Sequence, residues 1–304
     1  MSISELHAVA HPAIDPPAVT PREGLDFDLE GDIPRHWLDG DVFKTRFFDA
    51  MSTIFPQGER FFIACVRDYK DQIDDPAIQQ LMLDFARQEA QHSKVHMAFN
   101  KRLAEQGVKV DRILENQRRQ LFDIARKRFS RRYTLALTAA SEHLTAVMAE
   151  GFMDNKALFG NADPRLRAMY VWHGIEEIEH KAVAFDVMQQ VAHVGYWMRV
   201  WALIVVSLQF PFVTFQVLNH MLKVDGHHSR LARARIWLKG LRWLYGPGGL
   251  MLPLLKPYLA WYKPGFHPWQ QALPQGFEHW LQIMNRTGDP IQACNAIQQP
   301  PASA

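Results

Sequence analysis

Cysteine is scarce in this 304-residue sequence, which contains only Cys65 and Cys294. Two cysteines are too few for a disulfide scaffold and have no metal-ligand spacing, so we expect a reducing compartment. The N-terminus also lacks the basic start and the apolar run of a secretion signal. These absences together predict a cytoplasmic protein.

Acidic residues are almost missing from one long stretch. Between Val187 and Phe277 the only one is Asp225, whereas seven Lys or Arg fall between Gly226 and Phe277. The overall net charge of +2 gives no reason to expect a nucleic-acid partner. With 48% hydrophobic and 22% charged residues, the chain is typical of a globular protein. Nearly all acidic side chains, and with them the candidate metal ligands, precede Val187.

Two Glu-x-x-His motifs carry the functional signal. Residues three apart on a helix share a face, and each motif follows another glutamate on a different predicted helix. The six candidate ligands are Glu59, Glu89, His92, Glu142, Glu177 and His180. Glu89 follows Glu59 by 30 residues and Glu177 follows Glu142 by 35, which suits two helical hairpins. This pattern predicts an all-α, ferritin-like four-helix bundle around a di-iron or di-manganese site. The alternative is ordinary surface Glu and His.

Turn and cap signals place the helices. We expect a short helix from Val42 that ends before Pro56, and a first ligand helix from Pro56 to Tyr69. Asp74-Asp75-Pro76 starts a second one, without a breaker until Gly107. The remaining expectations are a basic crossover at 111–132, a third helix at 133–158 ended by Gly160, and a fourth from Asp163-Pro164 toward Val191.

His173 adds to the second motif. It precedes Glu177 by four residues, so all three side chains of His173-x-x-x-Glu177-x-x-His180 lie on one helix face. The alternative for His173 is a core histidine bonded to a backbone carbonyl. His96 shares the stripe of the first motif, and we expect it to support the ligands or to face solvent.

The last third of the chain is apolar and basic. Residues 200–222 contain no Asp, Glu, Lys or Arg, and residues 227–243 alternate basic with apolar side chains. Four alternatives stay open: the segments cover the bundle, form a homodimer interface, lie on the inner face of a membrane through residues 200–262, or span it. The expected division is an irregular arm (1–38), the di-metal bundle (39–192) and a hydrophobic and basic helical extension with a Pro-rich tail (193–304).

The ligand set resembles that of the para-aminobenzoate N-oxygenase group of di-iron enzymes, in which a third His precedes the last Glu by four residues. Over roughly residues 40 to 280, the chain more closely resembles the bacterial "predicted metal-dependent hydrolase" family. Glu89-Ala-Gln-His-Ser-Lys-Val-His and Ile175-Glu-Glu-Ile-Glu-His-Lys-Ala-Val-Ala-Phe-Asp-Val carry that second resemblance.

The sequence therefore predicts a non-haem di-iron, or Fe/Mn, oxygenase or oxidase. Two iron ions and O2 as co-substrate are expected, with Glu89 and Glu177 as bridges, His173 as an added nitrogen ligand, and the other four residues as terminal ligands. Four aromatic residues on the ligand helices predict a dry cavity for a hydrophobic or lipid-like substrate: Phe61, Phe62, Phe85 and Trp172. The electron donor is open. Two rivals remain, a two-metal hydrolase and a ferritin-like iron-handling protein.

Overall fold

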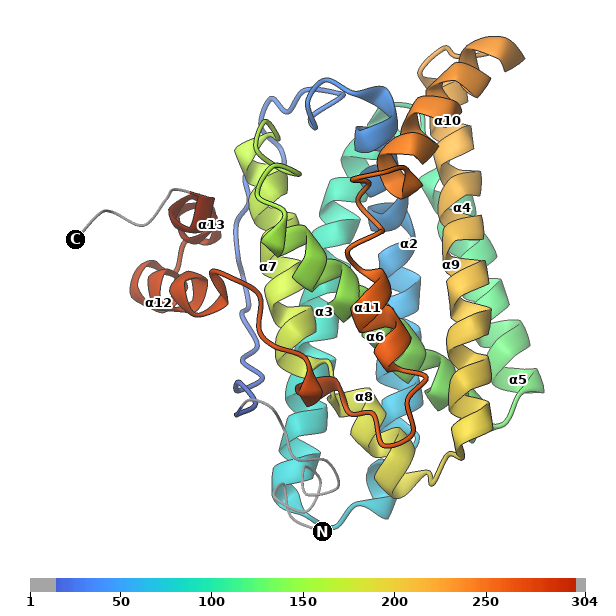
Figure 1. The fold of residues 1–304 in the computed structure, drawn as a ribbon, viewed down its shortest axis with the longest axis vertical. Helices are drawn as coiled ribbons and strands as arrows, with labels where there is room; N and C mark the ends of the chain where they lie inside the picture. The colour runs from blue at the N-terminus through green and yellow to red at the C-terminus, as the bar shows by residue number, and fades with distance from the viewer. Residues whose placement is uncertain (1–14, 299–304) are drawn as a thin grey trace.

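Long helices run side by side through the computed structural model, which describes residues 15–298 (Figure 1). Within this range there is no strand, only an isolated bridge between Leu38 and Ala162, so the all-α prediction is confirmed. The elements are α2 (Val42–Arg67), η1 (Lys70–Gln72), α3 (Pro76–Glu105), α4 (Val110–Arg118), η2 (Arg119–Ala125), α5 (Arg126–Arg128), α6 (Arg131–Asp154), α7 (Pro164–His180), α8 (Val183–Asp186), η3 (Val187–Val191), α9 (Tyr196–Val224), α10 (Arg230–Tyr245), α11 (Leu255–Ala260), η4 (Pro268–Gln270), α12 (Phe277–Thr287) and α13 (Pro290–Gln298).

Helix α2 is continuous, so the predicted break before Pro56 is wrong. Proline lacks the N–H that would bond the carbonyl of Ser52 one turn earlier. The Asn100 side chain of α3 donates to that carbonyl at 3.0 Å instead. A neighbouring helix therefore satisfies the group that proline frees, and α2 passes through Pro56 into the site.

The boundaries of the other ligand helices follow their caps. Asp75 caps α3 by accepting from Ala77 N, as its sequence predicted, and α3 runs for 30 residues. Helix α6 ends at Asp154, before the predicted end at Leu158. Helix α7 stops at His180, and two turn residues separate it from α8 and η3, so the single predicted helix toward Val191 is interrupted.

Helix α7 is buried on all sides around the motif, since every residue from Val171 to His180 is buried. Helix α6 crosses it closely at Gly174, where an added Cβ would lie 3.2 Å from the Cβ of Ala149. The irregular segment before α2 covers part of α7, because the Trp37 carbonyl accepts from Asp163 N and Arg22 reaches two glutamates of α7.

Helix α9 lies along α2 and α6, where Leu203, Leu218 and Met221 join the core (Figure 1). One side of α9 thus packs on the bundle, and the homodimer and membrane alternatives remain predictions for its exposed side. Within residues 15–298, α9 alone is long and apolar enough to cross a membrane, and 28% of its most apolar window is buried. A single such helix is weak evidence for a span, because core helices of soluble proteins have the same length and composition.

Candidate metal centre

Helices α2, α3, α6 and α7 bring all six predicted ligands together in the interior, and each is buried. The potential ligand atoms of Glu89, Glu142 and His180 lie within 4.8 Å of one another, and so do those of Glu59, Glu89 and His92. Glu89 therefore belongs to both groups. Glu177 lies between them, with Oε1 3.7 Å from His92 Nδ1 and 3.8 Å from His180 Nε2. This placement agrees with the bridging roles expected of Glu89 and Glu177, which remain predictions.

The site contains polar atoms that a bound cation would satisfy. Within the described part of the chain, seven of its buried N and O atoms complete no hydrogen bond: Glu59 Oε1, both carboxylate oxygens of Glu89 and of Glu142, His92 Nδ1 and His180 Nε2. His180 Nε2 lies only 3.1 Å from Glu89 Oε1 and 3.2 Å from Glu142 Oε2. Buried polar groups are normally paired. Oxygen and imidazole donors that converge without partners fit divalent metal ions.

The electrostatics of the site also fit a cation. Burial, followed by the charge of neighbouring glutamates, holds the pKa values of Glu59 and Glu89 well above the ordinary range. The same two causes raise the pKa of Glu142 to about 7. Burial also opposes ionisation of Glu177, but the hydrogen bond from His173 and the charge of the nearby His180 outweigh it and hold the pKa of Glu177 low. Four buried carboxylates repel one another when ionised, and metal ions relieve that repulsion.

His173 is also a predicted ligand, and its ligand atom lies within 4.8 Å of those of His92 and Glu177. In the described part of the chain, neither of its ring nitrogens bonds a backbone carbonyl. Its Nε2 is 2.9 Å from Glu177 Oε1, and its ring stacks on His92 with centroids 4.1 Å apart. Its Nδ1 lies 2.6 Å from His96 Nε2, and the other nitrogen of His96 lies 2.8 Å from Ser52 Oγ. His96 is completely buried, so it supports His173 and does not face solvent.

An outer layer of polar residues, which no sequence pattern predicted, orients the ligands. Glu176 accepts from His92 Nε2 at 3.1 Å, and Gln88 Oε1 accepts from His180 Nδ1 at 2.8 Å. Arg22 donates to Glu176 at 3.0 Å and to Glu179 at 2.6 Å. Partners of this kind fix the ring orientation of histidine ligands. A structural role for Glu176 and Glu179 could have been predicted, because glutamates on a helix that is buried on every side cannot face solvent and need partners.

Two hydroxyl groups donate hydrogen bonds to the carboxylates of Glu59 and Glu177. Ser93 Oγ donates to Glu59 Oε2 at 2.7 Å, and Thr145 Oγ1 donates to Glu177 Oε2. Beside them is a cavity of about 70 Å³, which we call the metal-facing cavity. Its lining is Ile54, Phe55, Gly58, Glu59, Phe62, Ser141, Leu144, Thr145, His173, Glu177, Val206 and Phe210. Most of this lining is apolar, so the cavity favours hydrophobic groups over water.

The four aromatic residues expected around the substrate have different positions. Phe62 lines the metal-facing cavity. Phe85 contacts the ring of His180 edge-on, and Trp172 contacts that of His92 while donating to Glu176. Phe61 packs against Phe122. Only Phe62 therefore lies where it could contact a substrate in this cavity.

The fold and the site define an all-α protein with a buried cluster of carboxylates and imidazoles suited to metal ions. The chain belongs to the family described as predicted metal-dependent hydrolase, whose model matches residues 20–272. That range includes every candidate ligand, Arg22 and α9. No curated protein and no solved structure matches the chain. The resemblance to the para-aminobenzoate N-oxygenase group is not shown, and the ferritin-like form of the bundle stays a prediction.

Proposed function

We propose that this protein is a two-metal hydrolase that acts on a hydrophobic substrate. The convergence of seven buried, unpartnered N and O atoms carries the metal-dependent part, and the family description favours hydrolysis. Glu59, Glu89, His92, Glu142, Glu177 and His180 would hold the ions, with iron or manganese suited to these donors. Two such ions would lower the pKa of a shared water and polarise the scissile group.

The residues around the ions have distinct tasks in this proposal. The outer layer of Glu176, Gln88 and Arg22 keeps both imidazoles oriented, and the Ser93 and Thr145 hydroxyls keep two carboxylates from rotating. The apolar wall of the metal-facing cavity excludes bulk water from the reacting group of the substrate. Exclusion of bulk water strengthens every charge interaction in the site.

A second candidate is an oxygenase with two iron ions, which requires O2 and an electron donor. Two observations favour it: the apolar lining of the metal-facing cavity and the third imidazole, His173, 2.9 Å from Glu177. A hydrolytic site needs only Lewis acidity and gains no obvious advantage from another neutral donor. The reactivity of an oxygen-dependent site is more sensitive to an added imidazole, because that ligand would change the electron density at one iron.

One experiment separates the two reactions. Iron- or manganese-loaded protein is incubated with acyl esters of increasing chain length, with and without O2, in water labelled with 18O. We expect metal-dependent turnover without O2 and one labelled oxygen in the acid product. Turnover that requires O2 and a reductant, with a rapid-mixing trace altered by His173→Ala, would establish the oxygenase instead. No metal-dependent turnover of either kind contradicts both.

We also propose that α9 and α10 contact the inner face of a membrane without spanning it. Leu208 and Phe212 on α9 are 70% and 62% exposed, and Leu238 on α10 is 73% exposed. Arg230 and Arg235 on α10 are exposed as well. Exposed apolar and basic side chains on neighbouring helices suit an anionic lipid surface.

The corresponding prediction is salt-dependent binding to anionic vesicles. Attraction between exposed charges is screened over about 10 Å at 0.1 M salt, so binding should fall as salt is added. Arg230→Glu with Arg235→Glu should weaken vesicle co-sedimentation, whereas Arg128→Glu, on the exposed crossover, should not. Equal binding by both variants, or none by the parent, would leave homodimer formation as the explanation for the exposed face.

A further inference from the structure

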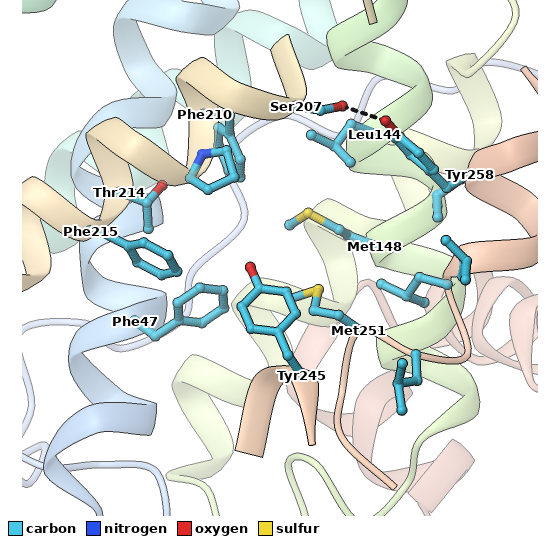
Figure 2. A pocket seen from close by; sticks show the side chains of 15 residues that line it. Phe47, Leu144, Met148, Ser207, Phe210, Thr214, Phe215, Tyr245, Met251 and Tyr258 are labelled. Atoms are coloured by element: carbon cyan, nitrogen blue, oxygen red, sulfur yellow. Dashed lines mark hydrogen bonds between the residues drawn. The ribbon is translucent and has the colours of Figure 1, made fainter. Parts of the chain in front are cut away.

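A second cavity, of about 280 Å³, lies between α6, α9 and the segment that follows α10 (Figure 2). Its wall is almost wholly apolar and includes Phe47, Val147, Met148, Phe215, Met251 and Leu254. None of the candidate metal ligands lines it. We call it the apolar cavity. Its volume is close to the lower end of the range for small-molecule pockets, about 300 Å³.

The apolar cavity adjoins the metal-facing cavity. Leu144 and Phe210 line both, and they lie at the same end of the apolar cavity in Figure 2. Phe210 also lines a third pocket of about 380 Å³, formed with η2 and α2. The Phe210 ring stacks on that of Phe55, with the two centroids 6.5 Å apart. Three spaces therefore meet at one side chain next to the candidate metal centre.

Few polar groups reach the apolar cavity. Ser207 Oγ and the Tyr258 hydroxyl are 2.9 Å apart and satisfy each other. Thr214 Oγ1 is buried and makes no hydrogen bond within residues 15–298. The Tyr245 hydroxyl points into the cavity (Figure 2). A ligand that fits this lining is therefore mostly hydrocarbon.

We propose that the apolar cavity holds the aliphatic chain of a fatty acyl substrate. Phe210 and Leu144 mark the boundary that the chain crosses to place its reacting group in the metal-facing cavity. The position of the reacting group rests on the proposed function; the binding of the chain does not. Leu252 and Leu255 line the apolar cavity and are about half exposed, at 48% and 51%, so the chain enters from an apolar surface.

The test fills the apolar cavity without touching the metal-facing one. Met148 lines only the former, and Met148→Trp should weaken binding of the fluorescent fatty acid 11-(dansylamino)undecanoate by at least about tenfold, as loss of fit in an apolar pocket does. Met97→Trp, at a position 44% exposed on α3, is the matched control and should bind like the parent. Unlabelled fatty acids should displace the probe, longer chains more effectively. Met148→Phe gives the same test with a smaller change if tryptophan prevents folding.

The outcomes separate this inference from the proposed function. No probe binding by the parent, or equal binding by Met148→Trp, Met148→Phe and Met97→Trp, would overturn it even if metal-dependent turnover is found. Binding that only the Met148 variants lose would support it even if no hydrolysis is found. If esters are hydrolysed, the Met148 variants should also raise KM for long chains more than for short ones.

Discussion

Glu89→Ala and Glu177→Ala each lose the dinuclear metal site. Glu89 belongs to two groups of potential ligands, and Glu177 lies within 3.8 Å of a nitrogen from each motif histidine. Removal of either carboxylate therefore affects both ions. We expect metal affinity to fall by more than the roughly 10- to 100-fold typical of residues outside the ligand set. Metal analysis of the purified proteins after dialysis against a weak chelator measures the loss.

Without metal, Glu89→Ala should not be less stable than the parent. In the metal-free protein, burial and the charge of Glu142 oppose the ionisation of Glu89, so its carboxylate disfavours folding near neutral pH. Glu89→Ala should consequently unfold at the same urea concentration as the metal-free parent, or at a higher one. Glu105→Ala, at an exposed position on the same helix, is the control and should keep both ions. Two ions retained by both site variants would contradict the assignment.

The candidate ligands could be predicted because the spacing that identifies each pair lies within a single helix. Glu-x-x-His places two side chains on one face of any helix, and the hairpin spacing brings the faces together. The path of α2 could not be predicted, because it depends on Asn100 replacing the hydrogen bond that Pro56 cannot make. Neither could the apolar cavity, whose walls come from segments far apart in the sequence.

The outer layer of polar residues around the ligands was the hardest part of the site to predict from local sequence. Arg22 lies in a segment without periodicity and reaches Glu176, 154 positions away. No local pattern links two such residues. The guanidinium is nevertheless almost buried, with 8% of its side chain exposed, and it also lies over the ring of Trp280 at 5.3 Å. A buried charge of this kind can be recognised only from the groups that surround it in the fold.

Replacement of Arg22 by Met should therefore destabilise the protein and weaken metal binding together. Removal of one partner from a buried ion pair leaves an uncompensated charge and typically costs about 3–5 kcal/mol. Burial already raises the pKa of Glu176 to about 7 against the opposing effect of Arg22. Without Arg22 that pKa rises further, and a protonated Glu176 is a poorer acceptor for His92 Nε2–H. We expect metal affinity about 10- to 100-fold lower.

Urea unfolding of the metal-free protein and chelator competition of the loaded protein measure the two effects separately. Arg35→Met on the same segment is the matched control, because Arg35 is 47% exposed and its pair with Asp225 should contribute little. Adding Glu179→Gln to Arg22→Met removes one of the two stranded charges and should recover part of the stability. It should not recover the metal affinity, since Glu176 still lacks its partner. Lower stability with unchanged affinity would make Arg22 a tether of the N-terminal segment and not a positioning residue for the metal ligands.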